Sequence, residues 1–286
     1  MKRIFTALVF IIASTLTFSQ TSIWKVSKGG NTVYLGGSIH LLRASDYPLP
    51  AEFDTIYKRA SKLVFETDIA KLEDPATAQK MLSQGMYKDG KTLKNVLNTK
   101  VYQDLEKACN EVNLPIANLN QFKPSMVVLI LTITKIKSLG VSEEGVDQYF
   151  FLKALADDKK TIGLEPFETQ IKLLTTMGDG NENEFVKHSL NEFHKMGKQM
   201  TSLITSWKTG DTKTMIKELE EMKTEYPALY VSMLINRNNA WLPQIEGFLT
   251  DKEVEFIIVG SLHLHGNDGL LTLLRDKGYQ VKQVQI

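Results

Sequence analysis

Two short apolar segments near opposite ends of the chain lead into the same sequence, Gly-Ser-x-His-Leu. They are TVYLGGSIHLL at 32–42 and EFIIVGSLHLH at 255–265. Short apolar runs that are rich in β-branched residues and bounded by glycine are typical of strands buried in a sheet. We therefore expect each copy to lie in a unit made of a strand, a loop, a helix and a further strand.

Alternating and apolar runs predict the other strands. SIWKVS and TVYLGG flank the glycine-rich residues 28–31, which predicts a β-hairpin. Further strands are expected at 62–66, 116–119, 159–165 and 279–284.

Helical periodicity covers most of the remaining chain. Helices are expected at 51–60 and 269–278, and helical patterns fill about 73–158 and 168–249 with a polar loop at 178–183.

The two ends of the chain are therefore expected to be halves of one central mixed β-sheet. This predicts an α/β (α+β mixed) fold in a single domain at 20–286, with a large helical insertion at about 70–250. The apolar stretch SMVVLILTITKI at 125–136 is too short for a membrane span of about 20 residues. It predicts a buried helix or the wall of an apolar groove.

Residues 1–19 have the pattern of a secretory signal peptide. Lys2 and Arg3 precede an apolar stretch at 4–18, which is shorter than a spanning helix. A retained membrane anchor is the alternative. We expect an exported protein, periplasmic or secreted, with no stable membrane span in the mature chain.

The charge balance limits the class of partner. Lys and Arg number 34 against 33 Asp and Glu, for a formal net charge of +1. No broad basic field favours nucleic acid, so a small molecule or a peptide or protein substrate is expected. The single cysteine, Cys109, cannot form an internal disulfide and shares a helical face with Val101, Leu105 and Val112, which predicts a buried structural role.

Four residues whose side chains can take part in catalysis or metal binding follow or terminate apolar strands: His40, Glu66, Glu165 and His263. Ligands of open α/β sheets bind beyond the carboxyl ends of the strands, so these side chains are expected to converge there. The glycine before each histidine is expected to let the chain turn sharply and to let backbone amides approach a ligand. The alternatives are core histidines bonded to backbone and strand-end carboxylates paired at the surface.

Two imidazoles and a carboxylate are the ligands that Zn, Mn or Co accept. His40, His263 and one glutamate are therefore expected to hold such an ion, with the second glutamate as the base that moves a proton from water to the leaving amine.

For several other polar residues, the sequence allows more than one role. Arg237 and Asn238, in NRNNAW, are either an exposed helical pair or an electrophilic clamp on a substrate oxygen. His265 is expected to support the site or face the substrate, and His188 and His194 are expected at the surface.

The motifs in this order resemble the TraB/PrgY/GumN superfamily, to which the Tiki membrane metalloproteases of the Wnt pathway are related. The resemblance runs from about Trp24 to the C-terminus and looks most like the exported GumN-type members. It is carried by YLGGSIHLL, KLVFETD, GVDQYFFLKA, KTIGLEPFETQ, NRNNAW and IIVGSLHLHGNDGLLTLLRDKGYQV.

The resemblance implies a fold related to erythromycin-esterase-like proteins. It also implies a metal site of His40, His263 and Glu66, supported by Glu165 and by the Arg237–Asn238 pair. Family members usually have a small or apolar residue where His265 stands, so the resemblance assigns that residue no role.

The sequence thus predicts an exported metal-dependent hydrolase that acts on peptide bonds. One alternative is a non-catalytic protein that binds or sequesters a peptide or signal in the same crevice. Another is a metal-independent, esterase-like hydrolase with His40 or His263 as general base, whose activity would survive chelation.

Overall fold

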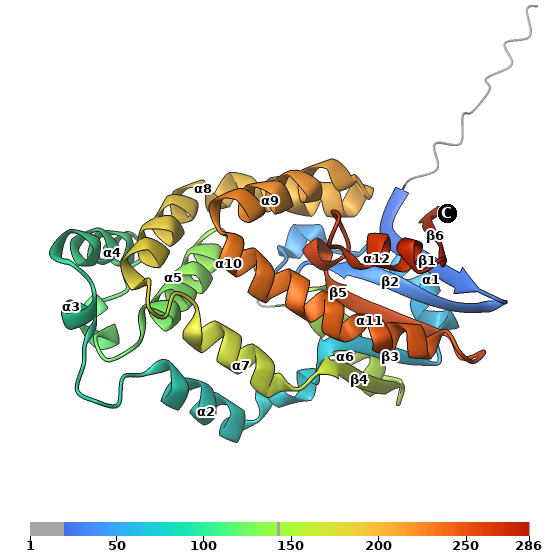
Figure 1. The fold of residues 1–286 in the computed structure, drawn as a ribbon, viewed down its shortest axis with the longest axis horizontal. Coiled ribbons are helices and arrows are strands. Elements are labelled where there is room, and N and C mark those ends of the chain that lie inside the picture. Colours follow the sequence, from blue (N-terminus) through green and yellow to red (C-terminus); the bar gives the residue numbers. More distant parts are fainter. Residues whose placement is uncertain (1–19, 142–143, 286) are drawn as a thin grey trace, which may run out of the picture.

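A six-stranded sheet in the order β4-β3-β5-β2-β1-β6 forms the centre of the fold (Figure 1). Its strands are β1 (Gln20–Lys28), β2 (Asn31–Ser38), β3 (Lys62–Thr67), β4 (Lys160–Glu165), β5 (Glu255–Gly260) and β6 (Gln280–Gln285). The computed structural model describes residues 20–141 and 144–285, so the predicted signal peptide at 1–19 lies outside the described residues. The predicted mixed α/β class is confirmed.

The two repeated segments are neighbours in this sheet. β2 pairs with β5 in parallel, and β5 pairs in parallel with β3, which pairs in parallel with β4. β1 is antiparallel to both β2 and β6. The predicted hairpin joins β1 to β2 through Gly29 and Gly30, which both have positive φ. The carboxyl ends of four parallel strands therefore meet at one edge.

Helices cover both faces of the sheet, as parallel strands require. On one face lie α1 (Ala51–Arg59), α6 (Val146–Ala156) and the end of α8 (Glu182–Thr209), and their apolar side chains share one core cluster with those of the sheet. On the other face lie α11 (Asn236–Phe248) and α12 (Leu270–Asp276). Burial on both faces explains why these strands are continuous apolar runs.

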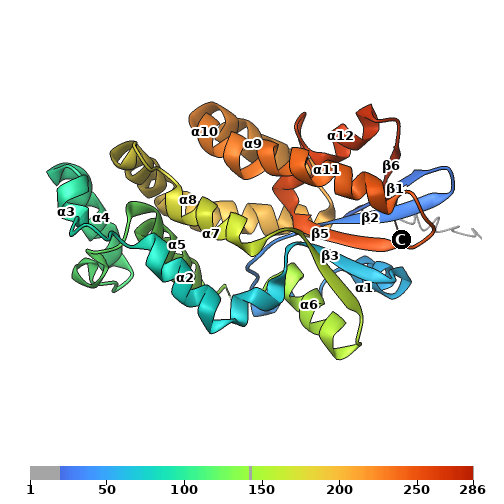
Figure 2. The same cartoon turned by 60° about the horizontal axis from the view of Figure 1, so that its bottom comes forward.

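The remaining helices form a lobe that extends from one end of the sheet (Figure 2). They include α2 (Pro75–Gly85), α3 (Leu93–Val96), α4 (Thr99–Glu111), α5 (Pro124–Ser138) and α7 (Phe167–Thr176). Helix α8 is about 42 Å long and joins the two parts: Phe193 packs in the lobe core, whereas Trp207 packs against the sheet. Cys109 is fully buried in the lobe core, as predicted.

A short stretch connects the lobe to the sheet face. Helices α9 (Thr212–Glu225) and α10 (Pro227–Tyr230) are followed by the π-helix Val231–Ile235, which runs into α11. Such widened turns inside helices are frequent at functional sites.

The strand predicted at 116–119 is wrong, because Ile116–Leu119 forms a 3-10 helix after Pro115. Ile116 and Leu119 are both buried in the lobe core, and three residues make one 3-10 turn, so both side chains fall on one side. The predicted insertion also contains β4, which belongs to the sheet. Within 20–141 and 144–285, no helix combines the length and the apolar character that a membrane crossing requires.

Candidate functional site

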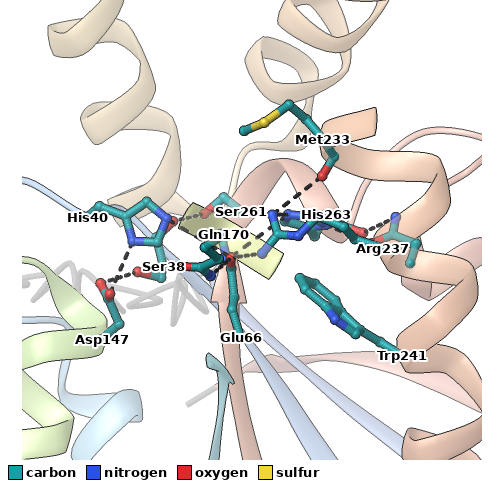
Figure 3. Close-up of polar contacts among 12 residues, drawn as sticks. Ser38, His40, Glu66, Asp147, Gln170, Met233, Arg237, Trp241, Ser261 and His263 are labelled. Carbon is teal, nitrogen blue, oxygen red and sulfur yellow. Dashed lines mark hydrogen bonds and ion pairs between the residues drawn. The ribbon is translucent and has the colours of Figure 1, made fainter. Parts of the chain in front are cut away.

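The histidines of the two repeats converge on one glutamate at the carboxyl edge of the sheet (Figure 3). His40 follows β2, His263 ends the 3-10 helix Ser261–His263 after β5, and Glu66 lies near the end of β3. Nε2 of His40 is 4.0 Å and Nε2 of His263 is 3.8 Å from the same oxygen, Oε1 of Glu66. The structure therefore brings together the three residues predicted as metal ligands.

Gly260 sits in the middle of this group. Its N–H donates to Glu66 Oε1 at 2.7 Å. A Cβ at this position would lie 3.1 Å from that oxygen and 3.6 Å from His40 Nε2. Its φ is −50°, a value open to any residue, so glycine serves here to leave space for the site rather than to permit an unusual turn.

His40 is oriented by Asp147, a residue that the sequence did not single out. His40 Nδ1 lies 3.1 Å from Asp147 Oδ2, and the Ser38 hydroxyl donates to Asp147 Oδ1 at 2.8 Å. The charge of Asp147 raises the pKa of His40 to about 9, although 60% of the imidazole side chain is exposed and solvent screens part of this attraction. Asp147 lies in the first turn of α6, within the motif GVDQYF, which was the available signal.

His263 is held as a neutral imidazole. Its Nδ1 is 2.7 Å from Asn238 Oδ1, and its Nε2 is 3.0 Å from Nη1 of Arg237. A guanidinium can only donate, so Nε2 accepts and Nδ1 carries the proton. Burial lowers the pKa of His263 to about 3, so the ring stays neutral at physiological pH.

Arg237 is buried between two carboxylates. Its Nη2 donates to Glu165 Oε1 at 2.7 Å and to Glu66 Oε2 at 2.5 Å, and its Nε donates to Glu165 at 3.0 Å. Its Nη1 reaches His263 and, at 3.4 Å, the carbonyl of Met233. All five N–H groups are thus engaged, and none is free for the predicted clamp on a substrate oxygen.

The two glutamates of this network differ in whether they line the crevice: Glu66 does and Glu165 does not. Both oxygens of Glu165 accept bonds, from Arg237 and from the indole N–H of Trp241 at 3.2 Å. The Arg237 guanidinium also stacks on the Trp241 ring, 4.5 Å from its centroid. Burial alone would raise the pKa of Glu66, but the charges of Arg237 and His40 and the hydrogen bond from the Gly260 N–H hold it below its usual value. Glu66 therefore stays ionised and faces the crevice, whereas Glu165 anchors Arg237.

Asn238 positions His263 from the neighbouring helix turn. Its amide nitrogen donates to the carbonyls of His263, at 3.2 Å, and Asp268, at 2.8 Å. The alternative of an exposed pair is wrong, because Arg237 is 7% and Asn238 is 1% exposed.

The other histidines lie elsewhere. His265 is buried with its ring edge against Trp24, at 5.1 Å between centroids, and it lines a different hollow of the surface. His188 is half-buried against Tyr226, and His194 is exposed.

The converging residues open onto a crevice of about 350 Å³. His40, Glu66, Asp147, Gln148, Gln170 and Arg237 form its polar part. The rest of the lining is almost entirely apolar.

The predicted ligands fit a divalent ion in type and in charge. An oxygen atom holds Nδ1 of each histidine and leaves Nε2 for the ion, which is the usual arrangement of metal-binding imidazoles. The three carboxylates Glu66, Asp147 and Glu165 carry three negative charges and Arg237 carries one positive charge, so the net charge is −2 once His40 has lost the proton that its raised pKa retains at neutral pH. A divalent ion would balance that charge.

The same atoms are not yet arranged as a ligand set. Among residues 20–141 and 144–285, no group of three or more His, Cys, Asp and Glu side chains has the arrangement of a metal site. The lone pair of His263 Nε2 is taken by Arg237, so that bond has to open before His263 can be a ligand.

Comparison with known proteins gives one match. The family model TraB/PrgY/gumN matches residues 22–283, which includes most of the sheet and every site residue described above. Neither the curated proteins nor the solved structures provide a match. The chain therefore belongs to the TraB/PrgY/gumN family.

Proposed function

We propose that the protein is an exported hydrolase of peptide bonds that uses a divalent ion, Mn, Co or Zn, held by His40, His263 and Glu66. The observation that supports this most is the convergence of two Nε2 atoms on one carboxylate oxygen, at 4.0 and 3.8 Å. When bound, such an ion lowers the pKa of a water ligand to about 7 and polarises the substrate carbonyl. Peptide bonds are proposed from the resemblance to the Tiki metalloproteases.

The residues around the ligands orient both imidazoles. Asp147 accepts from Nδ1 of His40 and Asn238 accepts from Nδ1 of His263. The Nε2 atom of each ring therefore faces Glu66, and it can bind an ion once His40 has lost its proton and the bond from Arg237 to His263 has opened. Since these partners are fixed by the fold, little ordering is required when a ligand arrives.

Arg237 contributes through the bond that has to open. When Nη1 leaves His263, it frees a lone pair on the imidazole and, at the same time, an N–H donor at the crevice. Glu165 and Trp241 keep the guanidinium in place during this change. The freed N–H can then donate to the oxyanion that forms as water adds to the substrate carbonyl.

The proton of the attacking water needs a carboxylate at the crevice. Glu66 and Asp147 line the crevice and Glu165 does not, so Glu66 and Asp147 are the carboxylates that can move this proton to the leaving amine. This differs from the sequence-based expectation, in which Glu165 was a candidate base.

A metal-independent hydrolase is the second candidate, because the His40–Asp147 pair alone has the geometry of an oriented general base. With a pKa of about 9, His40 is protonated at neutral pH, so this mechanism requires alkaline conditions.

Cleavage of a peptide library with and without chelator tests the proposal. We expect cleavage that Mn, Co or Zn restores after chelation, a loss of more than about 100-fold in Glu66→Gln, and unchanged cleavage in Glu111→Gln, an exposed residue of α4. Cleavage that survives chelation and rises toward alkaline pH would favour the second candidate. Absence of cleavage under every condition would contradict both.

A further inference from the structure

The crevice continues from the polar site into an apolar hollow. Ile69, Leu72, Leu173, Leu174 and Met233 line it, next to His40 and Arg237. At the rim of the hollow, the Leu72 side chain is 55% exposed, whereas Leu173 and Leu174 are half-buried. Apolar side chains gathered around a concave site, rather than scattered singly, indicate a ligand.

The elements that carry the polar groups also carry this apolar wall. Ile69 begins the 3-10 helix that follows Glu66, and Leu173 lies one turn after Gln170, which donates to Glu66 Oε2 at 3.4 Å. Met233 lies one turn before Arg237, and its side chain projects from the π-helix above the guanidinium (Figure 3). The hollow is therefore held in a fixed position relative to the reacting groups.

The charges of the lining restrict what the hollow can accept. The charged or titratable residues of the crevice are His40, Glu66, Asp147 and Arg237, and each already has a partner. Among residues 20–141 and 144–285, no lysine, arginine or acidic residue lies among the apolar residues of the hollow. A charged substrate side chain would lose its water without gaining a counter-ion, whereas an aliphatic side chain would gain free energy from the burial of its apolar surface.

We infer that this hollow is the specificity pocket of the proposed hydrolase and accepts a large aliphatic side chain, leucine or methionine, of the peptide residue next to the cleaved bond. This inference rests on the proposed function, because only a hydrolase would cleave the peptide that binds here. The apolar residues that define the pocket are not among the proposed metal ligands or proton carriers.

Two peptides that differ at one position test the inference. They are acetyl-Ala-Ala-Leu-Ala-Ala-amide and the same peptide with Ser in place of Leu. We expect calorimetry to show at least about tenfold tighter binding of the Leu peptide. Leu72→Asp and Leu174→Asp should reduce that preference to less than about threefold. Leu155→Asp is the matched control, because Leu155 is 68% exposed on α6 and outside the crevice, and it should keep the full preference.

The possible outcomes distinguish a failure of the proposed specificity pocket from a failure of the proposed hydrolase activity. Preferential binding of the Leu peptide without cleavage would support the pocket and contradict the hydrolase. Equal cleavage of both peptides would support the hydrolase and overturn the pocket. Equal binding, no binding of either peptide, or a preference that survives both crevice substitutions would also overturn it. Leu72 is exposed, so Leu72→Asp is expected to fold even if Leu174→Asp does not.

Discussion

Ser261 and Ser38, the serines of the two Gly-Ser-x-His copies, are hydrogen-bonded to each other: Ser261 Oγ donates to the carbonyl of Ser38 at 3.0 Å. Ser38 also pairs with Gly260 across the parallel strands. Gly37 leaves room for this contact, because a Cβ there would lie 2.6 Å from Ser261 Oγ. The repeat thus places two equivalent turns side by side, and each presents one histidine to Glu66.

Asp147→Asn is expected to weaken the site without unfolding the protein. The amide cannot hold His40 Nδ1–H as a carboxylate does, so metal affinity and kcat/KM should each fall about 10–100-fold. Asp157→Asn, at the other end of α6, is the control and should leave both unchanged. Unchanged metal affinity in Asp147→Asn would show that Asp147 does not orient a ligand.

Gly260→Ala is expected to disable the site by filling it. The new methyl group would lie 3.1 Å from Glu66 Oε1, closer than an ordinary contact, and 3.6 Å from His40 Nε2, so the Glu66 carboxylate has to shift and metal binding and activity should fall. Gly247→Ala in α11, where a Cβ meets nothing within 4 Å, should instead raise the free energy of unfolding by about 0.5–1 kcal/mol. Urea unfolding and peptide cleavage measure both effects. An active Gly260→Ala protein would contradict the convergence of these atoms.

Glu165→Gln is expected to cost stability as well as activity. The Glu165 side chain is 8% exposed and neutralises Arg237, so the substitution leaves a buried guanidinium with one carboxylate fewer and should lower the free energy of unfolding by about 3 kcal/mol. Glu168→Gln, an exposed residue paired with Lys80, should show no measurable change. If Glu165→Gln retains full stability, Glu165 does not anchor the guanidinium.

The pattern of the sequence predicts most strands, because apolar runs buried on both faces of a parallel sheet carry a strong signal. It does not predict the order of the strands, which depends on contacts between distant segments such as β2 and β5. It also fails at Ile116–Leu119, where four mostly apolar residues resemble a strand, but the preceding proline and two buried side chains make a helical turn.

The site residues that can be predicted from the sequence are those that come directly after an apolar strand or end one. His40, His263 and Glu66 are found in this way, and the structure brings them together. Asp147 is not, because an acidic residue in the first turn of a helix is an ordinary feature of helices. The burial of Arg237 likewise depends on partners that are distant in sequence, Glu66 and Glu165.

His265 is expected to make stability depend on pH. Burial lowers its pKa to about 4, whereas the unfolded chain binds the proton near pH 6.5. The unfolded state therefore holds more protons between these values, so the free energy of unfolding falls as the pH falls, by about 2–3 kcal/mol. His265→Gln should remove this part of the pH dependence in urea unfolding between pH 7 and pH 4, and His194→Gln, at an exposed position, should not. Identical pH profiles for wild type and His265→Gln would contradict the prediction.

Calorimetric titration of Mn, Co and Zn into the chelator-stripped protein tests the central claim most directly. We expect one tightly bound ion per chain in the wild type and none in a His40→Ala, His263→Ala double variant. A His188→Ala, His194→Ala double variant, which removes two histidines outside the site, should bind like the wild type. If the wild type binds none of the three ions, or if the His40→Ala, His263→Ala variant binds as well as the wild type, the paired histidines do not form a metal site.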